Sequence, residues 1–415
     1  MAEPKVRFKK DDGSSYPAWS DVVLGDIATR VTRKNTNGET DRPLTIASIE
    51  GLVDQRTYFG KTIASKDMSG YFLLKNGEYA YNKSYSAGYD YGSIKRLDKY
   101  DMGALSTLYI CFALNEDQNT DFYDCYFNGL SWYNQMPQIC AEGARNHGLL
   151  NVSPNDFFKI RLSVPSDKEE QQKIADLLSS ADEVISTSEQ EVANLETQKK
   201  AVMKKIFSQE VRFKRNDGTV FPEWEEQTLG NLAEFSKGQG YTKSDLSETG
   251  SPIILYGRLY TKYQTVISAV DTFAEMKSRS VLSKKGDVIV PASGETAEDI
   301  SVAAVVNVDG IILGGDLNII HPCDLILPDY LAYALTFGTP HQEMAKRAQG
   351  KSIVHLHNDD LKSAVIVYPC LEEQRLIADF LSDFDEAIMT AKKELELWKG
   401  LKKGLLQQMF VRGEV

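Results

Sequence analysis

The chain contains two copies of one pattern, about 205 residues apart. Val6-Arg7-Phe8-Lys9 recurs as Val211-Arg212-Phe213-Lys214, an offset of 211 − 6 = 205, and the match continues without a gap to Gly25 and Gly230. A second block, Glu169-Glu170-Gln171 through Asp182-Glu183, recurs at Glu372 with an offset of 372 − 169 = 203. The stretches between the blocks differ, apart from a weaker match just before the second one. The repeat predicts two similar units. Each unit has the repeated blocks as a shared frame and a dissimilar stretch, its middle, between them. Two such units would present two related surfaces with different specificities.

Composition sets limits on what the chain can be. Its 415 residues allow two or three domains, and the hydrophobic fraction of 42% is that of an ordinary globular chain. The sequence lacks an apolar run long enough to span a membrane, and its first five residues do not form a secretory signal, which favours the cytoplasm. The net charge of −12 argues against a protein that coats DNA generally. It is compatible with a DNA reader whose positive charge is local or whose partners supply phosphate contacts.

Two long helical patterns follow the two units. The first begins with Ser166 and Glu169, which form a capping-box signature, and no Pro or Gly interrupts it. In both patterns apolar side chains recur at alternating spacings of four and three, which is the heptad seam of a coiled coil. The predicted seam and partner-facing residues are Ile174, Leu178, Ile185 and Leu195 in the first pattern, and Ile377, Leu381, Ile388, Leu395 and Trp398 in the second. The simplest way to bury two matching seams is to pair them.

The repeat also predicts the order and direction of the segments. We expect a first unit at 1–165, a first helix at 166–209, a second unit at 210–369 and a second helix at 370–415. If the units fold alike, each helix leaves its unit at the same place, so the first runs from unit to unit and the second returns. The pair is then antiparallel with a pseudo-two-fold axis, and about 40 residues hold the units roughly 60 Å apart. The alternative is that each helix caps its own unit.

Inside the units, short strand patterns alternate with helix starts. Strands are predicted at 252–256, 286–291 and 363–367, with a further strand at 77–81 and a helix beginning at Pro328. The predicted fold class is therefore α+β, with two mixed α/β units separated by two long helices that form an antiparallel coiled coil, as a pseudo-two-fold tandem repeat.

Signals for catalysis are weak. The sequence contains no phosphate-binding Gly-x-x-x-x-Gly-Lys-Ser/Thr loop, no amino-methyltransferase Asn-Pro-Pro-aromatic segment and no Cys or His at metal-ligand spacing. Asp271, Glu275 and Lys277 have the residue types of a nuclease site, but such short patterns are common by chance. We therefore expect no catalytic residues, no metal and no cofactor bound by the chain itself.

Signals for DNA recognition are better, because tyrosines interleave with basic and amide side chains. Arg and Lys can donate to guanine, Asn and Gln can pair with adenine, and Tyr and Lys can anchor phosphates. A competing interpretation is that alternating tyrosines are half-buried strand residues. The candidate DNA-binding residues are Lys83, Tyr85, Ser86, Tyr89, Tyr91, Arg96, Arg145 and Asn146 in the first unit, and Lys237, Gln239, Tyr241, Thr242, Arg258, Tyr260, Lys262, Ser293, Lys346, Arg347, Lys351 and Ser352 in the second.

Taken together, the chain resembles the specificity subunit of type I restriction-modification systems. The resemblance rests on Pro222-x-Trp224 with Leu229-Gly230, on 288–296, on Gly314-Gly315-Asp316-Leu317 and on the paired Glu-Gln helix starts within the tandem arrangement. It implies two target-recognition domains that each read half of a split DNA sequence, with spacer helices that set the gap and dock two methyltransferase subunits. S-adenosylmethionine would belong to those subunits, and ATP and Mg to a possible endonuclease partner.

Two other functions remain open at this stage. The chain could be a restriction enzyme with its own nuclease, which loss of activity on changing Asp271, Glu275 and Lys277 to Ala would indicate. It could also be a tandem scaffold that binds only proteins, which an absence of sequence preference in a gel-shift assay with the methyltransferase subunit would indicate.

Overall fold

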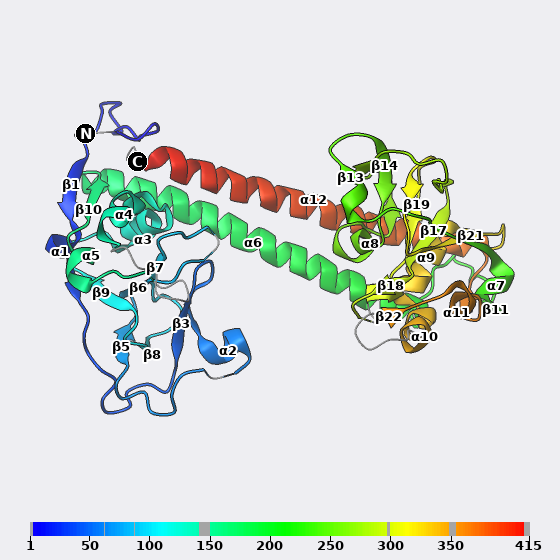
Figure 1. The fold of residues 1–415 in the computed structure, drawn as a ribbon, viewed down its shortest axis with the longest axis horizontal. Coiled ribbons are helices and arrows are strands. Elements are labelled where there is room, and N and C mark those ends of the chain that lie inside the picture. The colour runs from blue at the N-terminus through cyan, green and yellow to red at the C-terminus, as the bar shows by residue number, and fades with distance from the viewer. Residues whose placement is uncertain are drawn as a thin grey trace. The chain divides into compact units, whose positions relative to one another are not determined.

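The computed structural model describes residues 3–61, 63–86, 88–140, 150–296, 299–347 and 354–410. The chain divides into two compact units, Met1–Thr187 with Leu395–Val415 (unit 1) and Ser188–Glu394 (unit 2). Each unit therefore contains a globular part and half of each long helix, α6 (Lys168–Phe207) and α12 (Leu371–Met409) (Figure 1). Within the described part of the chain, no helix is both long and apolar enough to cross a membrane.

Unit 1 has an antiparallel four-stranded sheet with the order β2-β9-β6-β7, flanked by the pairs β1–β10, β3–β4 and β5–β8. The predicted strand at 77–81 is confirmed as β6. The elements of its globular part are β1 (Ser20–Val23), α1 (Leu24–Ile27), β2 (Ala28–Arg30), β3 (Leu44–Ala47), β4 (Gly51–Asp54), α2 (Gln55–Phe59), β5 (Phe72–Lys75), β6 (Tyr79–Asn82), β7 (Ser93–Arg96), β8 (Met102–Leu105), β9 (Ile110–Leu114), α3 (Thr120–Asn128), η1 (Ser131–Gln135), α4 (Met136–Ile139), α5 (Pro154–Phe157) and β10 (Arg161–Val164).

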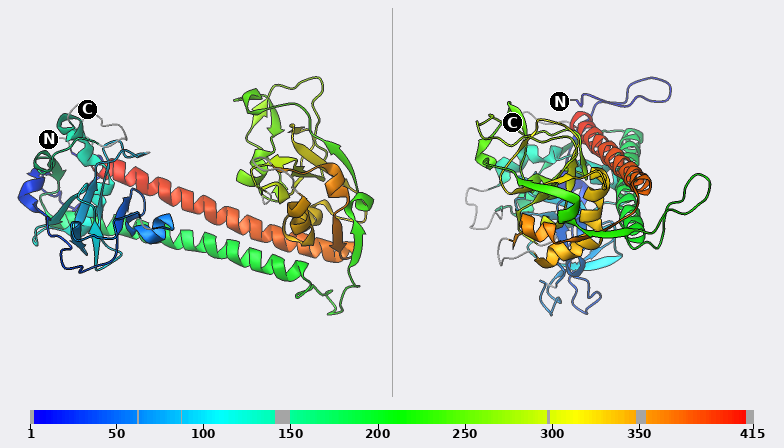
Figure 2. Two further views of the ribbon diagram at one scale, coloured as in Figure 1. Left: turned by 60° about the horizontal axis from the view of Figure 1, so that its bottom comes forward. Right: turned by 90° about the vertical axis from the view of Figure 1, so that its right-hand side faces the viewer.

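Unit 2 has a five-stranded sheet with the order β12-β21-β17-β19-β15 and a four-stranded sheet with the order β13-β16-β14-β20 (Figure 2). The predicted strands are confirmed as β14, β17 and β23, and the predicted helix as α9. The elements are β11 (Glu225–Thr228), α7 (Leu229–Leu232), β12 (Ala233–Lys237), η2 (Lys243–Asp245), β13 (Leu246–Ser247), β14 (Ser251–Ile254), α8 (Gly257–Thr261), β15 (Val266–Ile267), β16 (Phe273–Ala274), β17 (Asp287–Pro291), β18 (Ser293–Gly294), η3 (Asp299–Ser301), β19 (Ala304–Val306), β20 (Ile312–Leu313), β21 (Leu317–Pro322), α9 (Pro328–Phe337), α10 (Thr339–Arg347), β22 (Val354–His355), α11 (Asn358–Lys362) and β23 (Val365–Tyr368).

The repeated sequence blocks form the same local structure in both units. β1 pairs with β10 in unit 1, and β11 pairs with β23 in unit 2, both antiparallel. Each pair is followed by a glycine in close backbone contact: a Cβ on Gly25 would lie 3.0 Å from the carbonyl oxygen of Phe158, and one on Gly230 would lie 3.2 Å from that of Lys362. The repeated Leu-Gly dipeptides are therefore explained by close packing at the end of the shared strand pair.

A buried glutamate at the start of each long helix ties the repeated blocks together. The Arg7 guanidinium donates to both carboxylate oxygens of Glu170, at 2.9 and 2.8 Å, and that of Arg212 donates to both oxygens of Glu373, at 3.2 and 2.8 Å. Both glutamate side chains are 0% exposed. Each guanidinium also donates to a proline carbonyl, that of Pro17 or Pro222. The unit-2 carboxylate accepts a further bond from Trp224 Nε1. In each unit, the block that contains the arginine and the block that contains the glutamate are far apart in sequence, and this Arg–Glu contact joins them.

Each unit's hydrophobic core contains the start of one long helix and the end of the other. In unit 1, Ile174 and Leu178 of α6 share a core with Met409 of α12 and with Phe410. In unit 2, the corresponding core contains Ile377, Ala378 and Leu381 of α12 together with Met203 and Ile206 of α6. Within each unit, therefore, the two helices lie side by side and antiparallel (Figures 1 and 2). These contacts confirm the predicted α+β fold with paired antiparallel helices.

Ion pairs join the helices within each unit. Lys199 donates to Asp385 at 2.5 Å and Lys392 pairs with Glu196 at 2.6 Å in unit 2, and Lys402 donates to Asp182 in unit 1. Lys199 and Lys402 occupy equivalent seam positions, and the two aspartates belong to the repeated block. In unit 2, α6 provides the lysine and α12 provides the aspartate. In unit 1, α12 provides the lysine and α6 provides the aspartate.

Burial varies along the predicted seam. Ile174, Leu178, Ile377 and Leu381 are almost fully buried, as are Ile388 and Leu395, whereas Ile185 and Leu195 are half-buried. Trp398 is 38% exposed, and its role as a seam or partner-facing residue stays a prediction.

Replacing Glu373 by Ala should lower the unfolding free energy of unit 2 by about 3–5 kcal/mol, because the change breaks a buried, hydrogen-bonded ion pair. The neighbouring Glu372 is the matched control, since its exposed carboxylate pairs with Arg215 at 3.3 Å and its loss should cost less than about 1 kcal/mol. Chemical denaturation followed by tryptophan fluorescence measures both. Equal losses for the two variants would contradict the role assigned to Glu373.

Candidate nucleic-acid interface

The described unit-1 candidates lie on β7 and on the segment between β6 and β7. Tyr85 is 60% exposed, and Ser86 bridges to Ser48 through their hydroxyl oxygens at 2.9 Å. Tyr89 and Tyr91 are half-buried, and the ring of Tyr91 packs edge-on against that of Tyr133. Lys83 is half-buried, and burial lowers the pKa of its ammonium group. The structure thus brings this group of candidates together around one exposed segment.

Arg96 is held by two carboxylates. Its guanidinium donates to Asp98 and to Asp121, both at 2.7 Å, and its side chain is only 17% exposed. Asp121 lies 25 residues away on α3, so this pairing was not visible in the local sequence pattern. The role of Arg96 in DNA binding stays a prediction.

The unit-2 candidates separate into an exposed and a buried set. Lys237, Gln239 and Thr242 are exposed along the end of β12 and the turn after it. On α8, Arg258 and Tyr260 are half-buried, and Lys262 follows directly with an ion pair to Asp271. These residues form two surfaces of unit 2: a polar and basic one beside η2, and a basic and aromatic one at α8.

Tyr241 and Ser293 belong to the interior. Tyr241 is 7% exposed, and its hydroxyl donates to the carbonyl of Glu275 at 3.1 Å while it accepts from the backbone N–H of Lys277 at 2.8 Å. Ser293 is 5% exposed because it lies in β18, paired with β22. The prediction that these two side chains contact DNA is therefore wrong, since neither presents its side chain at the surface.

The remaining candidates cannot be assigned to a surface. Arg145, Asn146, Lys351 and Ser352 lie outside the described residues, and Lys346 and Arg347 lie at the end of α10 without described side chains. Their role in DNA binding stays a prediction, as does that of the exposed candidates.

The proposed nuclease residues do not form a carboxylate cluster. Asp271 pairs with Lys262 and with Arg258, and the Lys262 ammonium lowers the pKa of the Asp271 carboxyl. Lys277 instead pairs with Asp245 at 2.6 Å. Among the residues the structure describes, no group of three or more His, Cys, Asp or Glu side chains could hold a metal ion. The geometry gives the nuclease alternative no support.

One hydrogen-bonded row in unit 2 has the order of a catalytic triad. Ser236 Oγ lies 2.8 Å from His321 Nε2, and His321 Nδ1 lies 2.7 Å from Asp287 Oδ1. The three residues lie on β12, β21 and β17, which are adjacent strands of one sheet. Ser236 lies inside a paired strand and not at the sharp turn that exposes a nucleophile. We interpret the row as a cross-strand polar ladder, which sequence analysis missed because its members are far apart in the chain.

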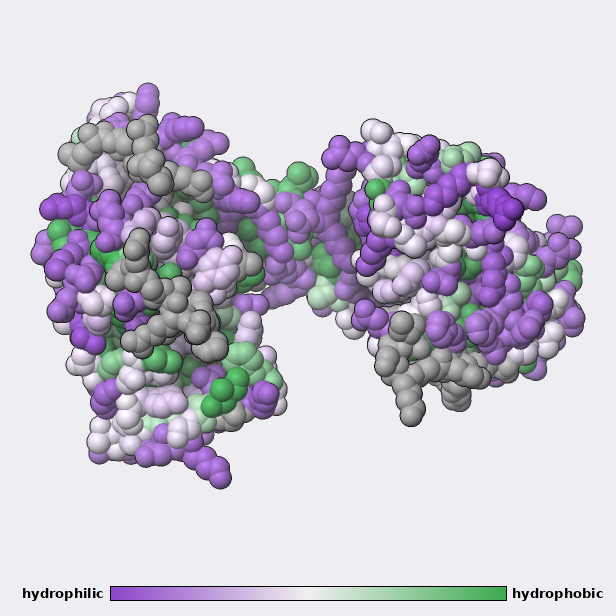
Figure 3. Space-filling view, in the orientation of Figure 1, coloured by the Kyte–Doolittle hydropathy of each residue, from purple (hydrophilic) through white to green (hydrophobic). Residues whose placement is uncertain are grey.

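The sequence also gave no sign of an exposed aromatic pair on α2 in unit 1. Tyr58 and Phe59 are 47% and 42% exposed, and their rings lie 4.9 Å apart. Figure 3 shows hydrophobic side chains in the region of α2. Exposed apolar patches on a domain surface commonly mark a binding site.

Two mixed units on paired helices, with repeated strand pairs and dissimilar segments between them, define a tandem-repeat architecture. Residues 222–397 match the family model of the type I restriction modification DNA specificity domain. The MjaVIII type I restriction enzyme specificity subunit of Methanocaldococcus jannaschii is 25% identical over 273 residues, 62% of this chain and 63% of the relative. The putative MjaX specificity subunit of the same organism is 27% identical over 223 residues, half of each chain. The chain thus spans between half and two-thirds of the length of these relatives.

Solved structures share the fold over nearly the whole chain. The S subunit of a type I restriction-modification system from M. genitalium has a TM-score of 0.59, with 14% identity and 99% of both chains covered. A chain from a study of complex assembly and conformational transition of the type I R-M system has a TM-score of 0.56, with 17% identity over 96% of this chain and 99% of that one. Together these comparisons confirm the predicted resemblance to type I specificity subunits.

Lys95 on β7 gives unit 1 a measurable pH dependence. Its side chain is 8% exposed, its ammonium donates to Asn128 Oδ1 at 2.6 Å, and burial lowers its pKa from 10.5 to about 8. Between these two pH values the unfolded chain holds a proton that the folded chain has released, so stability rises with pH. We expect the melting temperature of the wild-type chain to rise relative to that of Lys95→Met between pH 8 and pH 10. Lys99→Met, which changes an exposed lysine nearby, is the control. A constant difference between wild type and Lys95→Met would contradict the depressed pKa.

Proposed function

We propose that this chain is the DNA-reading subunit of a type I restriction-modification complex. Each globular part would read one half of a split target, and α6 and α12 would set the gap between the half-sites. The observation that carries the proposal is the repeated frame, with its twin Arg–Glu contacts, around middles that differ in sequence and topology. Two globular parts of different structure, joined by the same repeated elements, suit a DNA target whose two halves differ in sequence. Such a target is not palindromic.

The helix pair also offers surfaces for partner subunits. On α12, Leu397 and Leu401 are 66% and 50% exposed and lie one helical turn apart beside Trp398. In unit 2, a groove of about 460 Å³ lies along the pair, with Leu195 and Ala391 in it and Glu191, Glu386 and Glu394 among its lining residues. These surfaces support docking of two adenine methyltransferase subunits that bind S-adenosylmethionine, and of an endonuclease subunit that uses ATP and Mg. The chain itself would contribute recognition and no catalysis.

Sequencing of methylated adenines tests this function directly. Cells expressing the chain with its methyltransferase subunit should methylate adenines within one split sequence, whereas cells with the methyltransferase subunit alone should not. Methylation at scattered sites, or none that depends on this chain, would remove the proposal.

Exchanging residues 30–150 for the middle of another reader should change one half-site and leave the other intact, because the exchanged segment carries β6, β7 and β9 of the unit-1 sheet and leaves the shared strand pair in place. The exchange of residues 235–360 is the matched control and should change the opposite half-site. A change in both halves after either exchange would contradict independent reading by the two units.

A further inference from the structure

We infer that α2 of unit 1 is a wedge that inserts the Tyr58–Phe59 pair into a base step of double-stranded DNA. The inference rests on the proposed DNA-reading function and deepens it, because it adds deformation of the duplex to base recognition. Proteins that insert apolar side chains between base steps unstack and kink the duplex, and they gain contact area from the bend.

The geometry of α2 is that of a rigid knob outside the core. It is a single turn of five residues, none of them buried. Asp54 caps its start by accepting from the backbone N–H of Arg56 at 2.9 Å, and Gly60 ends it in the left-handed conformation at φ 64°. Gln55 fixes the turn from both sides: its amide donates to the carbonyl of Leu44 and accepts from the N–H of Ala64. A turn fastened at both ends can hold two exposed rings in a fixed orientation.

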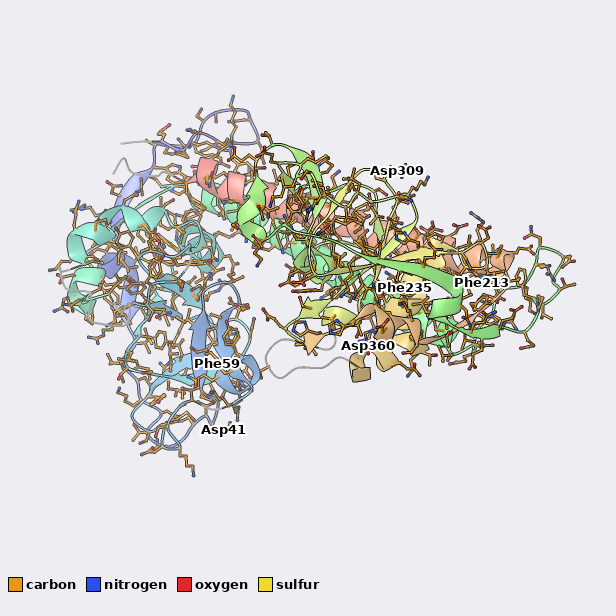
Figure 4. The ribbon with its side chains drawn as sticks, turned by 45° about the vertical axis from the view of Figure 1, so that its right-hand side comes forward. Asp41, Phe59, Phe213, Phe235, Asp309 and Asp360 are labelled. Atoms are coloured by element: carbon orange, nitrogen blue, oxygen red, sulfur yellow. The ribbon has the colours of Figure 1, made fainter. Side chains whose placement is uncertain are left out.

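The two rings form one perpendicular aromatic pair, in which one ring can lie parallel to a base while the other supports it edge-on. Their centroids lie 4.9 Å apart at an interplanar angle of 82°, so one presents a face where the other presents an edge. Figure 4 shows Phe59 near the edge of unit 1. The adjoining Ile63 is 58% exposed and widens the apolar surface. Leaving three large apolar side chains in water is unfavourable unless a partner covers them.

The charges around the rings favour DNA over an apolar protein surface. Arg56 donates to both oxygens of Asp54, at 3.1 and 2.8 Å, and Arg42 lies 3.8 Å from the same carboxylate. Arg56 also lies 3.4 Å from the exposed carboxylate of Asp41, so two carboxylates balance these two guanidinium groups. Lys61 adds an exposed cation one residue after the turn ends. Cations beside an apolar wedge can hold the phosphates that flank an opened base step.

Unit 2 carries a related but better anchored turn. α8 also has five residues and also places an arginine second and a tyrosine fourth, as Arg258 and Tyr260. Its third residue, Leu259, is 6% exposed and packs into the core, whereas the third residue of α2 is the exposed Thr57. The same local pattern is therefore anchored to the core by its third residue in unit 2, whereas in unit 1 the third residue is exposed. Insertion is assigned to unit 1 alone.

The test uses the full chain assembled with its methyltransferase subunit, on duplexes that carry its mapped target. 2-Aminopurine is placed in turn at each position of the unit-1 half-site except the methylated adenine, which the methyltransferase itself flips. The wild-type complex should raise the fluorescence at one step. Tyr58→Ala combined with Phe59→Ala should abolish that rise and weaken binding roughly tenfold to a hundredfold, on the scale of lost base–aromatic stacking.

Two variants separate insertion from a general effect on folding. Tyr58→Phe keeps the ring and should keep both signals, and Leu108→Ala, which removes a side chain that is 61% exposed elsewhere in unit 1, should leave both unchanged. Wild-type affinity and fluorescence in the double variant would overturn the inference. So would weaker DNA binding without any fluorescence rise in the wild type, or loss of methyltransferase binding with DNA binding intact. A wild-type complex without sequence preference would instead remove the proposed function together with the inference.

Discussion

The structure depends on the shared burial of the two long helices in each globular core. Neither core is complete with residues from one continuous stretch: unit 1 needs Met409 and Phe410 from the end of the chain, and unit 2 needs Met203 and Ile206 from the end of α6. A core that lacks such side chains would leave cavities of several methylene groups, and each buried methylene contributes about 0.8 kcal/mol. Pairing of the helices and folding of the units are therefore coupled.

The charges on the two helices favour their antiparallel orientation. Both helices begin with acidic residues that suit the helix dipole, and α6 ends with Lys204 and Lys205. Antiparallel pairing places the acidic start of α12 beside the basic end of α6, and the Lys199–Asp385 and Lys402–Asp182 pairs join the helices at equivalent positions. A parallel arrangement would bring the two acidic starts together. The buried Arg–Glu contacts join the segment before the first strand of each globular part to the start of the long helix that follows that globular part.

The sequence predicted the parts of the fold that depend on local or repeated signals. Both helices were visible because caps and heptads are local, and the shared frame was visible because the blocks recur. The middles were less predictable, because the burial of a side chain there depends on distant partners. Arg96 is bound by Asp121 and Tyr241 by the loop that contains Lys277, and neither partner is marked by spacing. The α2 wedge carried no repeat signal, and only the structure shows that Tyr58 and Phe59 are left outside the core.

The most direct test of the account removes one heptad from each helix, residues 187–193 of α6 and 391–397 of α12. This deletion leaves the Lys199–Asp385 and Lys402–Asp182 pairs in place and keeps the seam in register. It shortens each helix by about 10 Å, which corresponds to about three base pairs of DNA. Mapping of methylated adenines should then show the same two half-sites separated by a gap about three base pairs shorter. The original gap, retained in a stably folded double deletion, would contradict the claim that the paired helices set the spacing.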